Sequence, residues 1–422
     1  MSALRLELIN TGTELLLGQT LNTHAHWLGG QLFDIGIRIQ RQICIPDGEE
    51  IRAALVDAMP RCDAILVTGG LGPTSDDMTR EIAAGLFGVT LVEDPAVVGA
   101  IQAYLARRKR ELNAQTRRQA MVPVGARVLS NPNGTAPGLY FPPMSLPGRN
   151  RPTPHIFLLP GPPRELKPMY RDHVAPVLAG LLTEKPPGLR NFRLAGLGES
   201  QASLALEERL LATGIQELGY CVKPGEVIVR CIGSETQLDA CGAIVRESFP
   251  AEFFTDAEQA MEEVVVALLR ERREWLATAE SCTGGLLANR ITNVPGASAV
   301  FGWGFVTYAN EAKSGQVGVP AELIAAHGAV SEPVARAMAE GALKTAGADH
   351  ALAITGIAGP DGGSAEKPVG TVFIALASKR AATVAIRELF PFDRDMFKIM
   401  TTQTALDLLR RRLIGRAGPE SR

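Results

Sequence analysis

The first 170 residues or so alternate short apolar runs with longer segments of helical periodicity. Short apolar runs bounded by turn residues are typical of buried strands, and apolar positions that recur every three to four residues are typical of helices. Strands are predicted at 4–9, 37–44, 64–67 and 155–159, and helices at 22–32, 49–59 and 79–87. Because the two kinds of element alternate, the pattern predicts an α/β domain whose parallel sheet carries helices on both faces.

Glycine-rich loops follow two of the predicted strands. Thr68–Thr74 follows the strand that ends at Val67, and Pro160–Pro163 follows the strand that ends at Leu159. Ligands of such sheets bind beyond the carboxyl ends of the strands, and glycine lets the backbone approach phosphate oxygens. We expect one nucleotide pocket here, although tight turns without a ligand would have the same composition. Its expected lining is Glu14, Thr68, Gly69, Gly70, Gly72, Thr74 and Gly161.

Acidic residues accompany these loops. Asp76 and Asp77 follow the first glycine loop, and Asp47 follows another predicted strand. Carboxylates beside a phosphate site indicate a divalent metal ion, since they would otherwise repel the ligand. The alternative is that Asp76 and Asp77 cap the helix that begins at Thr79.

A different pattern occupies residues 177–252. The proline-rich segment Lys185–Gly188 predicts a linker. After it come a strand at 191–197, a helix at 201–211, a strand-like run at 221–232 interrupted by a turn at Pro224 and Gly225, and a helix at 238–247. This order predicts a small α+β module, for which a spacer or dimer-contact role is expected.

Ser281 lies between a predicted strand, Trp275–Ala279, and a predicted helix, Leu286–Thr292. Unpaired backbone N–H groups collect at the start of a helix, and they can stabilise an oxyanion that forms on an attacked carbonyl. A serine at this point is therefore a candidate nucleophile. The alternative is a plain N-cap, which is common before glycine-rich helix starts.

Lys313 is the candidate base for Ser281, because no histidine lies near the serine in the sequence. A lysine can accept a proton if burial lowers its pKa enough to leave it neutral. The apolar run Phe305–Tyr308 precedes Lys313, so partial desolvation at a strand end is expected, and the Tyr308 side chain could relay a proton or orient the amine. Cys282 is the rival nucleophile, although a free cysteine is more often a small buried apolar residue.

Three blocks of sequence resemble the C-terminal domain of the CinA family. They are Glu-Ser-Cys-Thr-Gly-Gly at 280–285, Thr-Tyr-Ala-Asn-Glu-Ala-Lys at 307–313 and Ala-Ile-Thr-Gly-Ile-Ala-Gly-Pro-Asp-Gly-Gly at 353–363. The resemblance implies a nicotinamide mononucleotide deamidase in which Ser281 is the nucleophile, Lys313 the base and Tyr308 the third member. It implies further oxyanion and substrate-binding residues, which are Thr283, Gly284, Asn310, Thr355, Gly356, Gly359 and Arg394. Arg394 is kept from the family pattern, whereas Phe392 and Lys398 depart from it.

The first 170 residues resemble the N-terminal half of the same family. The blocks are Gly-Thr-Glu-Leu-Leu-Leu-Gly at 12–18, the segment 68–77, Asn-Pro-Asn-Gly-Thr-Ala-Pro-Gly at 131–138 and the segment 159–166. The resemblance implies the fold of molybdopterin-binding proteins and hydrolysis of ADP-ribose with a divalent metal, to which Asp47 and Asp77 would contribute. Leu71 interrupts the Gly-Gly-Thr-Gly of the pterin-binding relatives, which weakens a pterin interpretation.

The resemblance also gives an organisation in three domains: a molybdopterin-binding-like domain at 1–170, a KH-like middle domain at 177–252 and a deamidase domain at 256–415. The middle segment lacks the Gly-x-x-Gly loop of RNA-binding KH domains. No cofactor is expected for the deamidase domain, and a homodimer is expected for the protein.

The composition bears on nucleic-acid binding, on cysteine-based metal sites and on membrane association. The 422 residues carry 43 Lys+Arg against 45 Asp+Glu, so a broad nucleic-acid-binding surface is not expected, and Arg107–Arg110 is interpreted as a solvated helix face. The six cysteines show neither a Cys-x-x-Cys pair nor zinc-ligand spacing with histidine. Without a signal peptide or a membrane-length apolar run, a cytoplasmic enzyme with no membrane partner is expected.

The sequence thus favours a bifunctional pyridine-nucleotide salvage hydrolase that acts on nicotinamide mononucleotide and ADP-ribose. Two alternatives from other classes stay open. The first domain could bind a nucleotide or pterin without turnover, or the protein could act as an interaction partner in competence or recombination.

Overall fold

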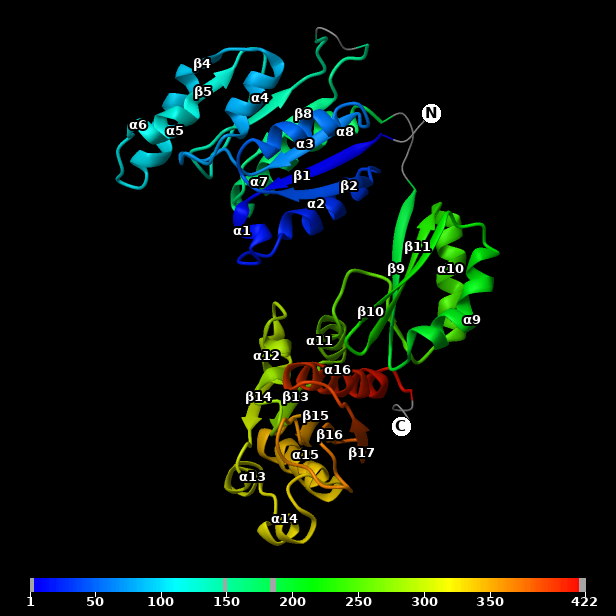
Figure 1. The fold of residues 1–422 in the computed structure, drawn as a ribbon. Helices are drawn as coiled ribbons and strands as arrows, with labels where there is room; N and C mark the ends of the chain where they lie inside the picture. Colours follow the sequence, from blue (N-terminus) through cyan, green and yellow to red (C-terminus); the bar gives the residue numbers. More distant parts are fainter. Residues whose placement is uncertain (1–3, 147–149, 183–186, 417–422) are drawn as a thin grey trace. The chain divides into compact units, whose positions relative to one another are not determined.

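The computed structural model describes residues 4–146, 150–182 and 187–416, which divide into two compact units at residues 186 and 187 (Figure 1). The first unit contains a six-stranded sheet, and the second contains a four-stranded and a five-stranded sheet. The predicted linker at Lys185–Gly188 lies partly outside the described residues. Its last residue, Gly188, begins a strand.

The main sheet of the first unit has the order β2-β1-β3-β8-β7-β6. Four strands are parallel: β2 (Ile39–Ile45), β1 (Leu6–Thr11), β3 (Ala64–Thr68) and β8 (His155–Leu159). Two antiparallel strands, β7 (Gly138–Phe141) and β6 (Arg127–Leu129), extend the sheet beyond β8. The predicted α/β class is therefore confirmed, and the antiparallel edge is an addition to it.

Helices cover both faces of this sheet (Figure 1). On β1, Ile9 packs in the core with α3 and α4, whereas Leu8 packs in the core with α2 and α7, because successive side chains of a strand point to opposite faces. The helices are α1 (Thr13–Leu16), α2 (Thr23–Asp34), α3 (Glu50–Ala58), α4 (Thr79–Phe87), α5 (Pro95–Ala106), α6 (Ala114–Arg117), α7 (Pro163–Met169) and α8 (Ala175–Ala179), and a small β-ribbon joins β4 (Leu91–Glu93) to β5 (Met121–Pro123).

The second unit begins with an antiparallel sheet of order β10-β11-β9-β12. Its elements are β9 (Gly188–Ala195), α9 (Glu199–Leu211), β10 (Glu217–Lys223), β11 (Glu226–Gly233), α10 (Glu235–Ser248) and β12 (Phe253–Thr255). The predicted run at 221–232 with its turn at Pro224 and Gly225 is part of a hairpin of β10 and β11, in which Gly225 adopts a left-handed φ of 71°.

The five-stranded sheet that follows has the order β14-β13-β15-β16-β17. Its strands are β13 (Leu276–Glu280), β14 (Phe301–Val306), β15 (His350–Gly356), β16 (Thr371–Ser378) and β17 (Ala381–Leu389), of which β14, β13 and β15 are parallel. The helices are α11 (Met261–Arg272), α12 (Leu286–Thr292), α13 (Asn310–Val317), α14 (Ala321–His327), α15 (Glu332–Ala346) and α16 (Arg394–Leu413).

The two faces of this sheet bury different side chains. Leu276 and Ile354 pack in one core with α11, α12 and α16, whereas Ala277 and Ala353 pack in the other core with α15. Small side chains on the second face let α15, which itself carries buried alanines, approach the sheet closely. The sheet thus holds the carboxyl ends of β13, β14 and β15 at one edge, where ligands of parallel strands bind.

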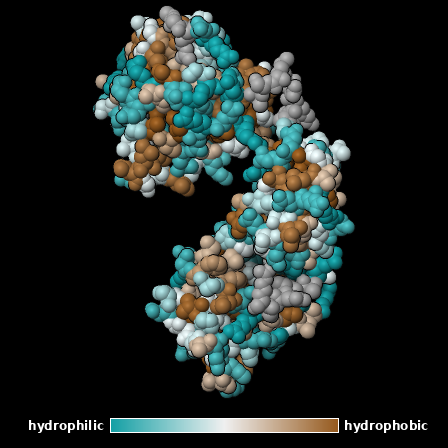
Figure 2. All heavy atoms as spheres, turned by 45° about the vertical axis from the view of Figure 1, so that its right-hand side comes forward, coloured by the Kyte–Doolittle hydropathy of each residue, from teal (hydrophilic) through white to brown (hydrophobic). Residues whose placement is uncertain are grey.

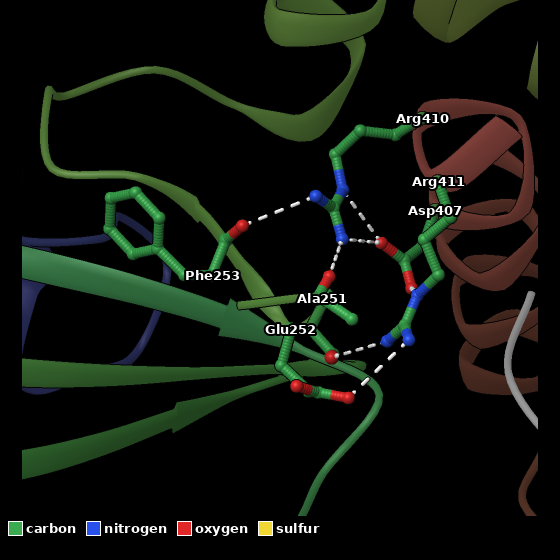
Figure 3. A network of polar contacts seen from close by, with 7 residues as sticks. Ala251, Glu252, Phe253, Asp407, Arg410 and Arg411 are labelled. Atoms are coloured by element: carbon green, nitrogen blue, oxygen red, sulfur yellow. Dashed lines mark hydrogen bonds and ion pairs between the residues drawn. The ribbon is translucent and has the colours of Figure 1, made fainter. Parts of the chain in front are cut away.

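A buried ion network connects α16 to the β9–β12 sheet (Figure 3). Asp407 accepts hydrogen bonds from Arg410 Nε and Arg411 Nε, both at 2.8 Å. The two guanidinium groups then donate to the main-chain carbonyls of Phe253 and Ala195, both at 3.2 Å. Since all three charged side chains are nearly inaccessible to solvent, the network fixes α16 against the preceding sheet.

Hydrophobic and hydrophilic residues are interspersed over the face shown in Figure 2. Within the described residues, no helix is both long enough and apolar enough to cross a membrane.

Candidate functional site

Ser281 directly follows β13 and precedes α12, as the pattern predicted. Its amide donates to the carbonyl of Ile354 on β15 at 2.9 Å, and its carbonyl accepts from the amide of Gly284 at 3.1 Å. The residue is 8% exposed. Ser281 therefore lies in a tight turn at the ligand-binding edge of the sheet, with its main chain fixed on both sides.

Lys313 lies beside Ser281. Its Nζ is 3.1 Å from Ser281 Oγ, and it also contacts the carbonyls of Thr307 at 2.9 Å and Tyr308 at 3.2 Å. The side chain is 1% exposed, and this burial lowers the pKa of the amine, although Cys282 and Glu311 act in the opposite direction. Lys313 belongs to α13 rather than to a strand end, and it is more deeply buried than the expected partial desolvation.

The amides around Ser281 are not all available to a substrate. The Gly284 amide donates to the Ser281 carbonyl, and the Leu286 amide donates to the Thr283 carbonyl. The amides of Gly285, Leu287 and Ala288 donate to the carboxylate of Glu280. Among the described residues, the amides of Cys282 and Thr283 donate to no other residue. The expected oxyanion role of Gly284 therefore has no free N–H to support it, and the Thr283 amide belongs to a residue that is 0% exposed in this structure.

Cys282 is poorly suited to act as the nucleophile. Burial raises the pKa of its thiol to about 12, with a smaller contribution from the nearby Glu280 carboxylate. The thiolate, not the thiol, is the attacking species, so this environment makes the cysteine inert at neutral pH.

The Tyr308 side chain does not contact the pair. Tyr308 is 61% exposed, and its hydroxyl accepts a hydrogen bond from Arg394 Nη2 at 3.1 Å. The Tyr308 main-chain carbonyl, rather than its phenol, orients Lys313. Arg394 also donates to the Gly359 carbonyl at 2.9 Å, so it connects Tyr308 to the loop after β15.

The other residues implied by the resemblance are dispersed around this edge. Asn310 is exposed at the start of α13, and Gly356 is the last residue of β15. Thr355 is buried, and its hydroxyl donates to the Ala329 carbonyl at 2.8 Å. Thr355 thus holds the segment before α15, and its hydroxyl is already engaged.

The two glycine loops of the first unit line one cavity of about 370 Å³. Its wall contains the predicted residues Glu14, Asp47, Gly69, Gly70, Gly72, Asp76, Asp77 and Gly161, together with Thr11, Gln119, Thr135 and Glu165. Side chains would not fit at two glycines, because a Cβ on Gly69 would lie 2.5 Å from the Thr11 carbonyl and one on Gly70 would lie 2.1 Å from Thr79 Oγ1. Thr68 is the last residue of β3, directly before the first glycine loop, and Thr74 is exposed at the end of that loop.

The three aspartates have different surroundings. Asp47 Oδ2 accepts from the Thr13 amide at 3.1 Å, and Asp77 Oδ2 accepts from the Thr74 amide at 3.0 Å. The Thr74 hydroxyl and nearby amides hold the pKa of the exposed Asp76 carboxyl below its usual value. The helix-cap alternative is wrong for α4, since no side chain caps that helix.

A metal ion held by protein groups alone does not fit these residues. In the described parts of the chain, no three His, Cys, Asp or Glu side chains come close enough together to bind one ion. One or two of the carboxylates could still hold a cation jointly with phosphate oxygens and water, which is how Mg²⁺ is usually bound. The aspartates therefore fit a cation that arrives with its phosphate ligand.

Profiles of two families match most of the chain. The family described as "Probable molybdopterin binding domain" matches residues 7–180, and the family described as "CinA C-terminal domain" matches residues 258–413. A CinA-like protein from Akkermansia muciniphila is 48% identical over 406 residues, which cover 96% of this chain and 97% of that protein. The chain belongs to the CinA family.

The chain is also similar to other proteins of the CinA family. A CinA-like protein from Citrifermentans bemidjiense is 41% identical, with 98% of each chain covered. The crystal structure of the competence/damage inducible protein CihA from Agrobacterium tumefaciens is 39% identical, with a TM-score of 0.34, and covers 37% of this chain and 97% of that one. The two family matches alone show that a molybdopterin-binding-like domain and a CinA C-terminal domain occur together in this chain.

Two residues of the CinA-family chain were missed by the sequence interpretation. Glu280 is 1% exposed and its carboxylate holds the start of α12. Gln119 is 1% exposed in the wall of the first cavity, where its Nε2 donates to the Leu71 carbonyl at 3.1 Å. For Glu280, the only sequence feature that could have indicated its role is its position directly before a serine at a strand end. No sequence feature indicated the role of Gln119.

Proposed function

We propose that the C-terminal domain of this CinA-family chain hydrolyses the carboxamide of nicotinamide mononucleotide to nicotinate mononucleotide and ammonia. The observation that carries this proposal is the 3.1 Å contact between Ser281 Oγ and the buried Nζ of Lys313. A hydroxyl beside a desolvated amine is an activated nucleophile for acyl transfer. The family resemblance supplies the substrate.

The contacts of Lys313 suit both protonation states. A neutral amine has two N–H groups, which match the carbonyls of Thr307 and Tyr308, and one lone pair, which faces the Ser281 hydroxyl. Once it has taken the serine proton, the ammonium has three N–H groups for the same three oxygens. The base can therefore gain and lose a proton without rearrangement.

The reaction would proceed through an acyl-enzyme. Ser281 Oγ attacks the carboxamide carbon while Lys313 takes its proton, and main-chain amides of the turn after Ser281 would have to face the substrate to hold the oxyanion. When the C–N bond breaks, Lys313 returns the proton to the departing nitrogen, which leaves as ammonia. A water molecule, deprotonated by Lys313, then cleaves the ester, releases the acid and restores Ser281.

A coupled ammonia assay with nicotinamide mononucleotide, nicotinamide riboside and nicotinamide tests the substrate assignment. We expect the mononucleotide to have the largest kcat/KM, because binding energy from the phosphate and ribose can be used at the carboxamide. Equal turnover of the three amides would contradict a nucleotide site, and no turnover of any of them would contradict an amidase.

The pH dependence should report Lys313. Burial lowers the pKa of the amine below its usual 10.5, and only the neutral form accepts a proton, so kcat/KM should rise with pH through this pKa and then level off. Glu311 raises that pKa, so Glu311→Gln should move the rise to lower pH. A steady-state pH profile of both proteins measures this shift. A rise that moves to higher pH, or does not move, would contradict Lys313 as the titrating group.

We further propose that the first unit hydrolyses ADP-ribose. The shared cavity of the two glycine loops supports this proposal, because backbone at Gly69 and Gly70 can approach a diphosphate, and the family resemblance points to this substrate. A divalent cation, when bound with the substrate, would neutralise phosphate charge beside Asp47 and Asp77. Binding of ADP-ribose without turnover would favour the alternative of a nucleotide-binding module.

Asp77→Asn should lower ADP-ribose hydrolysis at least about tenfold while shifting the melting temperature little. Asparagine keeps an acceptor for the Thr74 amide but removes the negative charge. The variant therefore distinguishes cation binding by Asp77 from its hydrogen bond within the loop. Phosphate release from ADP-ribose in a phosphatase-coupled assay gives the rate. Asp63→Asn is the matched control, since Asp63 also accepts from a main-chain amide, that of Arg5 at 3.0 Å.

Two results would contradict the Asp77 prediction. The first is full activity of Asp77→Asn. The second is wild-type activity that survives EDTA, because a site that needs no cation would leave the aspartates without the proposed task.

A further inference from the structure

We propose that Glu280 is a positioning residue for the reaction at Ser281. Its carboxylate fixes the turn that presents the nucleophile, and its main-chain carbonyl fixes the segment that holds Lys313. The inference rests on the proposed pairing of Ser281 with Lys313, and it concerns a residue that acts through both of them.

The Glu280 carboxylate is buried and fully engaged with backbone donors. The side chain is 1% exposed, and it accepts hydrogen bonds from the amides of Gly285 at 3.1 Å, Leu287 at 3.0 Å and Ala288 at 2.8 Å. A buried carboxylate without partners would be costly, whereas charge-assisted bonds to amides are strong. These donors belong to the start of α12, where helices leave N–H groups unpaired. The carboxylate therefore joins the end of β13 to the start of α12.

The turn between these two points combines glycines with main-chain hydrogen bonds. Gly284 and Gly285 adopt left-handed φ values of 60° and 95°, which glycine reaches readily. Within the turn, the Gly284 amide donates to the Ser281 carbonyl at 3.1 Å and the Leu286 amide donates to the Thr283 carbonyl at 3.2 Å. The Glu280 side chain adds three hydrogen bonds to these, so it contributes to the shape of the turn. In that shape, the turn holds Ser281 Oγ within 3.1 Å of Lys313 Nζ.

The main chain of Glu280 is also connected to Lys313 through hydrogen bonds. Its carbonyl accepts a hydrogen bond from the Thr307 amide at 2.8 Å. The Thr307 carbonyl in turn accepts from Lys313 Nζ at 2.9 Å. Because Ser281 follows Glu280 directly in the chain, one residue connects the two members of the catalytic pair through covalent and hydrogen bonds.

Glu280→Gln and Glu280→Ala test this role in the full-length protein, with Glu263→Gln as the matched control. Glu263 also accepts from a main-chain amide at a helix start, that of Ala260 at 2.6 Å, but it belongs to α11. Three quantities are measured for each variant: kcat and KM for nicotinamide mononucleotide, the melting temperature, and the rate at which a sulfonyl fluoride modifies Ser281. In that modification Ser281 Oγ bonds to sulfur, fluoride leaves and Lys313 takes the proton.

We expect Glu280→Ala to lower kcat roughly 100-fold, because misplacing a catalytic group by about 1 Å has an effect of this size. Glu280→Gln keeps one acceptor oxygen, so a loss of about tenfold is expected. In both variants KM should stay within about threefold of the wild-type value, and the modification rate of Ser281 should fall in parallel with kcat. Glu263→Gln should retain the wild-type kcat even if its melting temperature falls by as much as that of the Glu280 variants.

Several outcomes would overturn the inference. They are wild-type kcat and modification rates in both Glu280 variants, or an equal loss of kcat in Glu263→Gln. If Glu280→Ala does not fold, Glu280→Gln decides alone. If the wild type releases no ammonia but Ser281 is modified in a Glu280-dependent way, the deamidase proposal fails and the positioning role stands.

Discussion

Ser281→Ala is expected to lower ammonia release from nicotinamide mononucleotide by roughly 10⁴-fold or more, since a covalent mechanism cannot proceed without its nucleophile. The fold should be retained, because the main-chain bonds of Ser281 to Ile354 and Gly284 do not involve the hydroxyl. The measurement is kcat/KM in the coupled ammonia assay, with the melting temperature recorded in parallel.

Cys282→Ala is the matched control for the nucleophile. It removes the neighbouring side chain of the same turn, and we expect turnover within about threefold of the wild type because a buried thiol with a raised pKa does not attack. Normal turnover in Ser281→Ala together with lost turnover in Cys282→Ala would transfer the role to the cysteine.

Lys313→Arg and Lys313→Met are both expected to lower kcat by roughly 10³-fold or more, because neither side chain can accept the serine proton. The guanidinium stays protonated at any physiological pH, whereas methionine fills similar space without a nitrogen. KM should change much less than kcat. Lys344→Arg is the control, since Lys344 is exposed near the end of α15 in the same domain.

The arginine variant separates two roles of Lys313. A lysine that only attracted the substrate phosphate could be replaced by arginine, so retention of more than about a tenth of wild-type turnover would favour binding over proton transfer. The burial of Lys313 and its contacts with two carbonyls support the proton-transfer role.

Some elements that are bounded by clear turn residues were predicted, whereas others, including the long helices α15 and α16, were not. The helix predicted at 286–292 matches α12, and the strand at 155–159 matches β8. Strands β6 and β7, of three and four residues, are too short to show a period, so the antiparallel edge of the first sheet was missed. Pairing between distant strands is set by tertiary contacts that no local pattern records.

The chemistry of the candidate site was harder to predict than its location. The sequence brought Ser281 and Lys313 together, but it placed the lysine at a strand end and assigned the Tyr308 side chain to the pair. In the structure, Lys313 belongs to a helix and Tyr308 is exposed. Main-chain carbonyls, which every residue possesses, hold the lysine amine in place of the Tyr308 phenol. Main-chain acceptors and donors leave no signal in residue identity, and the same reason concealed the role of Glu280.

The central claim is that the pair Ser281 and Lys313 cleaves an amide bond of nicotinamide mononucleotide. The most direct test follows ammonia and nicotinate mononucleotide in the same reaction of the purified full-length protein, by coupled assay and by chromatography. The account predicts that both products appear in a one-to-one ratio. Release of nicotinamide and ribose phosphate without ammonia, or no consumption of the nucleotide, would contradict it.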